Sequence, residues 1–170
     1  VDGRAVTIGN AAFLNQRGVK VGALERQADA LRDDGATAIF VGIDHKAAGV
    51  IGIADPVKAT TPKALAALKA AGLRIIMLTG DNRKTAEAVA RTLGIADVEA
   101  DVLPDRKASV VARLKSEGAV VAMAGDGVND APALAAADVG IAMGSGTDVA
   151  IESAGVTLLK GDLTGIVRAR

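Results

Sequence analysis

From about residue 60 onward, apolar and polar positions follow a repeating order along the chain. A stretch with helical spacing ends in glycine, a short apolar run follows, and a polar loop comes after that run. Short apolar runs that alternate with helical stretches of about ten residues are typical of parallel strands joined by helices. The runs are apolar throughout, which indicates that both faces of the sheet are covered. The pattern predicts an α/β fold with helices on both faces of a parallel sheet.

The boundaries of these elements follow from glycine, proline and polar residues between the apolar runs. The predicted helices are 62–71, with Thr61 as its N-cap, then 82–93, 106–117, 129–136 and 148–153. The predicted strands are 73–78, a short one near Val98, 119–124, 139–143 and 156–159. Gly72, Gly94 and Gly118 are expected to end the helices that precede them.

The first 54 residues have a different pattern. A short apolar run covers 6–10, a helical stretch covers 21–35, and two strand-like runs at 38–43 and 49–54 flank a polar turn. Two such runs around a turn predict an antiparallel hairpin. Asp55-Pro56 is a natural boundary. We therefore predict two domains, an α+β domain over 1–54 and the repetitive α/β domain over 55–170.

The composition narrows the classes of function. Aromatic residues make up 1% of the 170 residues, so the core is expected to be aliphatic. Lys plus Arg equal Asp plus Glu at 20 each, which gives no electrostatic case for nucleic acid as a partner. The absence of cysteine excludes disulfides and thiolate metal sites within this sequence. No apolar run approaches the roughly 18 residues of a membrane helix, so a soluble, cytosolic piece is expected.

Three polar clusters follow predicted strands. They are Thr79-Gly80-Asp81, Lys107 shortly after its strand, and Gly-Asp-Gly-Val-Asn-Asp at 125–130. In an open α/β sheet, ligands bind outside the carboxyl ends of the strands. The placement of the three clusters is therefore the first functional signal.

The residue types in these clusters suit a phosphate and a hard cation. Paired carboxylates without His or Cys favour Mg²⁺, which binds oxygen and water. A Thr hydroxyl with the N–H groups at Thr79-Gly80, the amide of Asn129 at a helix start, and the Lys107 ammonium favour an anion. Gly125 and Gly127 would permit a close backbone approach and unusual conformations. The sequence predicts a site for Mg²⁺ beside a phosphoryl group.

Each cluster by itself has an ordinary structural interpretation. Gly125-Asp126 is common turn chemistry, Thr79-Gly80-Asp81 could serve as a helix N-cap, and Lys107 could be a solvated helix residue. The order of the three clusters, each after a strand, favours the functional interpretation. Neither of the familiar glycine-rich nucleotide loops is present in the sequence.

The sequence resembles the P-type ATPases that transport heavy metals, and within them the copper and silver type. The matching stretches are Asp-Pro-Val-Lys at 55–58, Met-Leu-Thr-Gly-Asp-Asn at 77–82, Leu-Pro-Asp-Arg-Lys at 103–107 and the segments 123–134 and 137–152. The resemblance implies a haloacid-dehalogenase-like, Rossmann-like phosphorylation domain over 55–170. It also implies that 1–54 is the C-terminal part of a nucleotide-binding domain, with Asp55-Pro56 as the hinge.

The resemblance also implies roles for individual residues. Thr79 and Lys107 would contact the transferred phosphoryl group, with Gly80 beside them. Asp126 would hold Mg²⁺, Asn129 and Asp130 would complete the site, and Asp81 would support it. Gly9 and Asn10 would approach bound ATP. Mg²⁺ and ATP are thus the implied cofactors, and export of copper or silver driven by an aspartyl-phosphate is the implied activity.

Several motifs of that family are missing from this sequence. They are the Asp-Lys-Thr-Gly-Thr motif with the nucleophile, the His-Pro and Gly-x-Gly nucleotide motifs, the Thr-Gly-Glu of the actuator domain, and the membrane helices. We therefore expect a fragment from the cytosolic portion of a pump in the plasma or inner membrane. Its expected partners are the remaining pump domains and a missing central strand, with the transported metal bound elsewhere. Without that strand, self-association of an inactive fragment is a further expectation.

Two other functions remain open. A stand-alone haloacid-dehalogenase-like phosphatase would need a nucleophilic Asp, for which Asp44 is the best early candidate, although no second Asp follows two residues later. A non-catalytic module that binds Mg²⁺ and phosphate would need no nucleophile at all.

Overall fold

The structure, a computed structural model, describes residues 1–144, 148–158 and 161–169. It divides into two compact units, the first formed by Val1–Pro56 with Asp81–Ala100 and the second by Val57–Gly80 with Asp101–Arg170. The segment Asp81–Ala100 is thus grouped with the first residues of the chain, although the repeating pattern places it in the 55–170 region. The predicted division into domains 1–54 and 55–170 remains a prediction.

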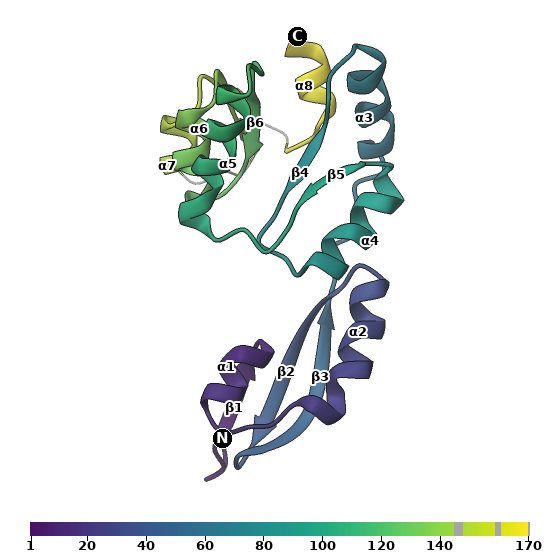
Figure 1. The fold of residues 1–170 in the computed structure, drawn as a ribbon, viewed down its shortest axis with the longest axis vertical. Coiled ribbons are helices and arrows are strands. Elements are labelled where there is room, and N and C mark those ends of the chain that lie inside the picture. Colours follow the sequence, from purple (N-terminus) through teal and green to yellow (C-terminus); the bar gives the residue numbers. More distant parts are fainter. Residues whose placement is uncertain (145–147, 159–160, 170) are drawn as a thin grey trace. The chain divides into compact units, whose positions relative to one another are not determined.

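A three-stranded antiparallel sheet forms the centre of the first unit (Figure 1). Its strands are β1 (Val6–Gly9), β2 (Thr37–Ile43) and β3 (Lys46–Ile53), in that order. The predicted hairpin is confirmed, and Asp44 and His45 form its two-residue turn with φ angles of 48° and 63°. Positive φ at both turn residues matches the right-handed twist of the flanking strands.

Helices cover one face of this sheet. They are α1 (Ala11–Gln16), the 3₁₀ turn η1 (Gly22–Leu24) and α2 (Glu25–Asp33). The predicted helix 21–35 is shorter in the structure and begins with the 3₁₀ turn, and α1 was not predicted because six residues show no clear periodicity. The core between α1, α2 and β2 is formed by Leu14, Val19, Val21, Ala28, Ala38 and Phe40.

The same unit contains α4 (Arg83–Leu93) and β5 (Asp97–Glu99). Asn82 caps the start of α4, since its side chain accepts a hydrogen bond from the backbone N–H of Lys84, and Gly94 ends it with a φ of 63°. The end at Gly94 agrees with the sequence expectation, whereas the helix begins one residue later than predicted. The buried Thr85 donates its hydroxyl to the Ala36 carbonyl at 3.0 Å, which ties α4 to the loop before β2.

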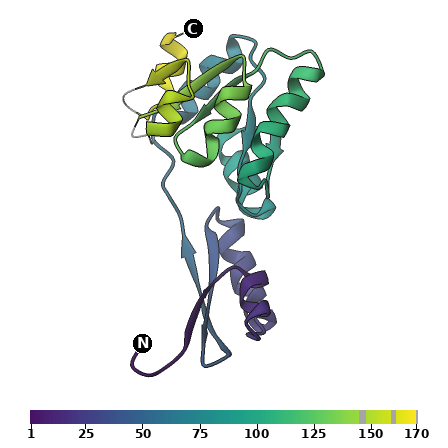
Figure 2. The ribbon, with the colours of Figure 1, turned by 90° about the vertical axis from the view of Figure 1, so that its left-hand side faces the viewer.

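The second unit contains a parallel sheet in the order β6-β7-β8, with helices between the strands (Figure 2). Its elements are α3 (Thr61–Ala70), β4 (Ile76–Leu78), α5 (Pro104–Ser116), β6 (Ala122–Gly125), η2 (Val128–Asp130), α6 (Ala131–Ala136), β7 (Val139–Met143), α7 (Asp148–Glu152), β8 (Val156–Leu158) and α8 (Thr164–Ala169). The predicted parallel pairing is confirmed for β6, β7 and β8. Strand β4 is not part of this three-stranded sheet, and α8 was not predicted. The resemblance at 145–147 and the predicted strand end at Leu159 lie outside the described residues.

Two strands begin later than the hydrophobic pattern predicts. Strand β4 starts at Ile76 instead of Leu73, and β6 starts at Ala122 instead of position 119. In both cases the preceding glycine has a positive φ, and the next residue donates its N–H to a carbonyl of the helix just completed. These residues therefore belong to the helix ending, in a Schellman-type arrangement that apolar patterning does not distinguish from strand.

Helix α3 also begins one residue earlier than predicted. Thr60, not Thr61, occupies the N-cap position, and it makes no side-chain capping hydrogen bond. Its hydroxyl instead donates to Asp162 Oδ2 at 3.1 Å. Among the described residues, no helix combines the length and apolar character needed to cross a membrane.

Candidate functional site

A pocket of about 420 Å³ opens within the second unit, beside the carboxyl end of β6. Its lining comes from segments far apart in the chain and includes charged side chains of both signs. The lining residues are Lys58, Leu78, Lys107, Met123, Ala124, Gly125, Asp126, Asp130, Met143 and Gly161.

A mostly buried ion pair lies in this pocket. Lys107 Nζ, from α5, is 2.6 Å from Asp130 Oδ1, at the end of η2, and the two side chains are 16% and 11% exposed. The other carboxylate oxygen of Asp130 accepts the N–H of Gly127 at 3.4 Å. An ion pair removed from water needs this kind of additional hydrogen bonding to offset the loss of hydration.

The close approach of Asp130 to β6 depends on Gly125. A Cβ atom at position 125 would lie 2.7 Å from both Cβ and Oδ2 of Asp130, so a side chain there requires Asp130 to move. The prediction that Gly125 and Gly127 adopt conformations closed to other residues is wrong. Neither has a positive φ, and Gly127 is extended at φ −111°. Position 125 requires glycine because the Asp130 side chain leaves no room for a Cβ atom, and not because the backbone there has a positive φ.

Asp126 is exposed at the mouth of the pocket, and no hydrogen bond or ion pair engages its side chain among the described residues. Across the described residues, no group of three or more His, Cys, Asp or Glu side chains is placed to hold a metal ion. Two carboxylates do fit Mg²⁺, which commonly uses one or two protein carboxylates and takes its other ligands from water and phosphate. The donor set at Asp126 and Asp130 therefore suits that cation.

The remaining predicted residues of the second unit lie close to the pocket without lining it. Thr79 directly follows the lining residue Leu78, and its carbonyl accepts the N–H of Val102 at 3.1 Å. A Cβ at Gly80 would lie 3.3 Å from the Val102 carbonyl oxygen. Asn129 is exposed in η2. Sequence reasoning thus places Lys107, Asp126 and Asp130 in one pocket correctly, while the roles of these residues stay predictions.

Asp81, Gly9 and Asn10 belong to the first unit. Asp81 accepts a hydrogen bond from the Thr37 hydroxyl at 3.0 Å. Asn10 caps α1, since its Oδ1 accepts the N–H of Phe13 at 2.8 Å, and a Cβ at Gly9 would lie 2.6 Å from the Phe13 ring. The contacts with Phe13 at the start of α1 thus explain why Gly and Asn occupy positions 9 and 10. The approach of these two residues to ATP stays a prediction.

Asp44, the candidate nucleophile of a stand-alone phosphatase, is in the hairpin turn of the first unit. Its carboxylate accepts Arg4 Nε at 2.8 Å and the N–H of Ala5 at 3.0 Å. These contacts give Asp44 a structural role in holding the residues before β1 against the turn.

The sequence analysis did not assign Lys58 and Gly161 to the site. Lys58 was quoted only as part of the Asp-Pro-Val-Lys stretch, and its Nζ donates to the Gly161 carbonyl on the pocket wall. The two residues are 103 positions apart, so no local pattern could have paired them.

Strand β6 is at an edge of its sheet. It pairs with β7 on one side, and in the described residues no other strand joins this three-stranded sheet beyond β6. The pocket contains Met123, Ala124 and Gly125 of this edge strand together with Leu78 at the end of β4. The edge strand β6 therefore borders the pocket.

Comparison with known proteins identifies the family. A family model described as haloacid dehalogenase-like hydrolase matches residues 3–138, and a second model with the same description matches 108–169. The chain belongs to the haloacid dehalogenase-like hydrolase family. The expected haloacid-dehalogenase-like α/β fold is thereby confirmed.

Curated relatives match this haloacid dehalogenase-like chain over nearly its whole length. A silver-exporting P-type ATPase of Salmonella typhimurium is 64% identical over 170 residues, which cover 100% of this chain and 21% of the relative. A copper-transporting P-type ATPase of Rhizobium leguminosarum bv. viciae is 60% identical over 169 residues, or 99% of this chain and 20% of the relative. The chain thus spans about a fifth of the length of these relatives. The resemblance to copper and silver P-type ATPases is confirmed.

Solved structures give the same result for the fold. The crystal structure of a zinc-transporting PIB-type ATPase in the E2.Pi state matches with a TM-score of 0.67 and 37% identity, covering 99% of this chain and 27% of that chain. The catalytic domain of the CPx-ATPase CopB-B matches with a TM-score of 0.64 and 33% identity, covering 77% of this chain and 52% of that chain.

Proposed function

We propose that the chain is the ATP-binding and phosphorylation segment of a heavy-metal-translocating P-type ATPase. The observation that supports this most is the convergence of Lys107, Asp126 and Asp130, from α5 and the loop after β6, in one pocket. An ammonium beside two carboxylates is suited to a phosphoryl group with Mg²⁺. The ammonium attracts the anionic phosphoryl group, and the carboxylates attract the cation.

The proposed roles of the individual residues follow this charge arrangement. Lys107 and Thr79 contact the phosphoryl group, and Gly80 leaves space beside them. Asp126 holds Mg²⁺, Asn129 and Asp130 complete its surroundings, and Asp81 supports the site. When bound, Mg²⁺ supplies positive charge that stabilises the transferred phosphoryl group. Gly9 and Asn10 of the first unit approach ATP.

The open edge of β6 is the proposed place of the missing strand. An added strand that carries the nucleophilic Asp of an Asp-Lys-Thr-Gly-Thr motif would pair with β6 and bring its carboxylate beside Lys107 and Asp126. Without this strand, we expect no ATP turnover by the 170-residue chain. In the full pump, the energy of the aspartyl-phosphate would be coupled to metal export.

The transported ion is proposed to be copper or silver, in line with the names of the relatives. The segment would lie on the cytosolic side of the plasma or inner membrane, and its partners would be the transmembrane and actuator domains of the same pump. The metal-binding sites for transport would lie in those domains.

A binding experiment on the 170-residue chain tests the proposal. Titration calorimetry should detect inorganic phosphate binding that requires Mg²⁺, and Asp126→Asn should abolish it. Asp105→Asn is the matched control, because Asp105 is in the first turn of α5 and does not line the pocket. Phosphate binding that is independent of Mg²⁺, or unchanged in Asp126→Asn, would contradict the proposal.

A second experiment, an assay of phosphate release from ATP, tests whether the chain contains its own nucleophile. The chain should release no phosphate from ATP at any Mg²⁺ concentration. Reproducible ATP hydrolysis that Asp126→Ala abolishes would mean that the chain already contains its nucleophile, and the proposed inactivity would be wrong.

A further inference from the structure

The pocket contains a second lysine that the proposed function does not use. Lys58 precedes α3, lines the same pocket as Lys107, and donates from Nζ to the carbonyl of Gly161. An ammonium group has three N–H donors, and the Gly161 carbonyl needs only one of them. Lys58 therefore retains donor capacity at the pocket wall.

Residues 161–162, which Lys58 contacts, make further hydrogen bonds. Two residues after Lys58, the Thr60 hydroxyl donates to Asp162 Oδ2 at 3.1 Å, and Asp162 Oδ1 accepts the N–H of Thr164 at 2.9 Å. The hydrogen bond from the Thr164 N–H, with smaller contributions from the Thr60 hydroxyl and the charge of Lys58, lowers the pKa of Asp162 below its ordinary value. These contacts hold 161–162 beside the segment that carries Lys58.

The space around the ammonium is also limited. A Cβ built at Gly161 would lie 3.2 Å from Lys58 Nζ, so the glycine allows the amine to rest directly on the pocket wall. The glycine at 161 therefore leaves room for the ammonium of the exposed Lys58 beside the pocket wall.

Among the described residues, no carboxylate forms a direct ion pair with this second cation, although the charge of Lys58 also acts on Asp162. Lys107 is paired with Asp130 at 2.6 Å, and Asp126 is an exposed residue of the pocket lining. No salt bridge involves Lys58 among the described residues. A cation that is held in a pocket by a neutral carbonyl remains available to attract an anion.

We propose that Lys58 is a second anion-binding residue of this pocket and contacts the same tetrahedral oxyanion of the phosphate class as Lys107. This inference rests on the proposed function, because it assigns a further contact to the same phosphoryl group. The competing structural interpretation is that Lys58 only fastens 161–162 to the start of α3.

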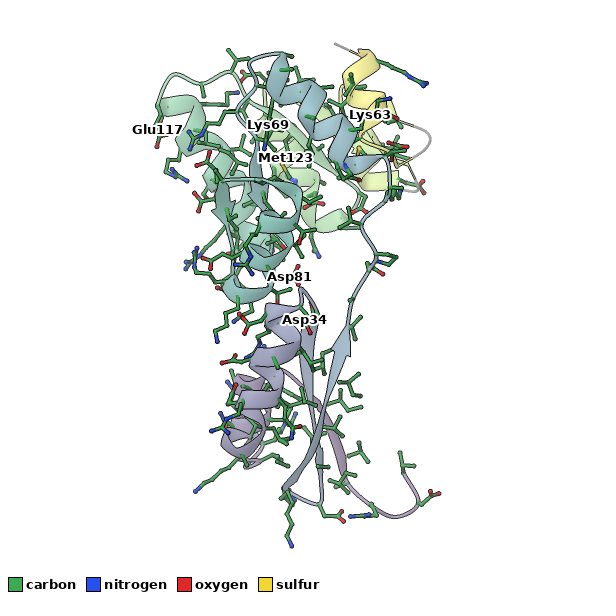
Figure 3. The ribbon with its side chains drawn as sticks, turned by 90° about the vertical axis from the view of Figure 1, so that its right-hand side faces the viewer. Asp34, Lys63, Lys69, Asp81, Glu117 and Met123 are labelled. Atoms are coloured by element: carbon green, nitrogen blue, oxygen red, sulfur yellow. The ribbon has the colours of Figure 1, made fainter. Side chains whose placement is uncertain are left out.

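Three substitutions separate the two interpretations. Lys58→Gln removes the charge, Lys58→Arg keeps a charge at the same place, and Thr60→Ala loosens the Thr60–Asp162 contact while leaving the ammonium intact. Lys63→Gln is the matched control, since Lys63 is an exposed lysine of α3 that does not line the pocket (Figure 3).

The experiment is a titration of inorganic phosphate into the 170-residue chain at saturating Mg²⁺, repeated at two salt concentrations. Lys58→Gln should weaken phosphate binding by about tenfold and reduce its dependence on salt, because one charge-assisted contact is lost. Lys58→Arg should recover most of the affinity, and Thr60→Ala and Lys63→Gln should bind like the wild type. Mg²⁺ affinity, measured without phosphate, should be equal in all variants.

The outcomes distinguish this inference from the proposed function. If the wild type binds phosphate with Mg²⁺ but Lys58→Gln does so equally well, the assignment of Lys58 is wrong and the proposed function stands. If Thr60→Ala weakens binding as much as Lys58→Gln, the role of Lys58 is structural. A wild-type chain that binds no phosphate overturns both.

Discussion

Three residues, Gly125, Gly127 and Lys107, determine the position of Asp130. Lys107 neutralises one carboxylate oxygen, the N–H of Gly127 binds the other, and Gly125 provides the space for its side chain. Thr85 and Asp130 are the buried polar residues in the described part of the chain. Because burying a carboxylate is costly unless it is paired, a small steric change at this point should affect the whole pocket.

The substitution Gly125→Ala tests this steric argument. The added methyl group would occupy space 2.7 Å from Asp130, so the carboxylate must move away from Lys107. We expect the free energy of unfolding to fall by about 1–3 kcal/mol, as is typical of overpacking, and Mg²⁺-dependent phosphate binding to be lost. Urea denaturation and calorimetry measure the two effects.

Gly127→Ala is the control for that substitution. Position 127 has an ordinary extended φ, and the nearest atom to a new Cβ is 3.7 Å away, within normal contact distance. Stability and binding should stay close to those of the wild type. Equal effects at both positions would mean that the space at Gly125 is not the controlling feature.

Helix α6 packs closely against β7, and glycine makes this contact between elements possible. A Cβ at Gly140, in β7, would lie 2.7 Å from the carbonyl oxygen of Leu134 in α6 and 3.3 Å from the Cα of Ala154. Backbone atoms on two sides cannot move independently of the elements that contain them. The distance between α6 and β7 is therefore set by the absence of a side chain.

Gly140→Ala should separate α6 from β7 and lower the free energy of unfolding by about 1–3 kcal/mol. The comparison is with Gly155→Ala, since no atom lies within 4 Å of a Cβ at position 155 and its φ is not positive. Urea denaturation followed by circular dichroism measures both. A Gly140→Ala variant as stable as Gly155→Ala would contradict the close packing described here.

Asp138, the residue before β7, is hydrogen-bonded to Val121, the residue before β6. Its Oδ2 accepts the N–H of Val121 at 2.9 Å, its Oδ1 is 3.0 Å from Lys115 Nζ, and its own N–H donates to the Val121 carbonyl. The hydrogen bond from Val121, followed by the one from Lys115, lowers the pKa of the Asp138 carboxyl.

A lowered pKa in the folded state makes this contribution to stability depend on pH. The contribution is present above the unfolded-state pKa, near about 3.9, and is lost as the pH falls through the folded-state value. Asp138→Asn should therefore be less stable than the wild type at neutral pH, with a difference that shrinks below about pH 4. Lys115→Met should show a smaller effect, because the Val121 N–H remains. A difference that is constant down to pH 2 would refute this account.

At the scale of the whole molecule, one face of the β1-β2-β3 sheet is apolar and exposed. Alternate residues of the strands point to this face, opposite the face that is covered by α1 and α2. Its most exposed members are 41–56% accessible and are Val6, Ile8, Ile51 and Ile53. A contiguous exposed patch of this kind marks an interaction surface or a tendency to associate.

We expect the isolated chain to associate with itself through this face. Sedimentation velocity should show a sedimentation coefficient that rises with protein concentration, and the double substitution Ile8→Lys/Ile51→Lys should abolish the rise through charge repulsion. Val120→Lys is the control, because Val120 is 87% exposed but belongs to the second unit. A wild-type chain that stays monomeric at all concentrations would contradict the prediction.

The sequence by itself predicted most of the helices and strands and the residue types of the site, but not α1 or α8. Apolar runs bounded by glycine predicted the parallel strands of the second unit, and Gly94 predicted the end of α4. The roles of Lys107, Asp126 and Asp130 as phosphate and cation ligands stay predictions, although all three line one pocket. These features are local, since capping, periodicity and ligand type depend on a few neighbouring residues.

The tertiary structure alone decided which distant residues meet. The contact of Lys58 with Gly161, the space that Gly125 leaves for Asp130, and the exposed face of the first sheet each depend on how separate segments pack. Packing and hydrogen bonding act between segments that the linear pattern treats as independent.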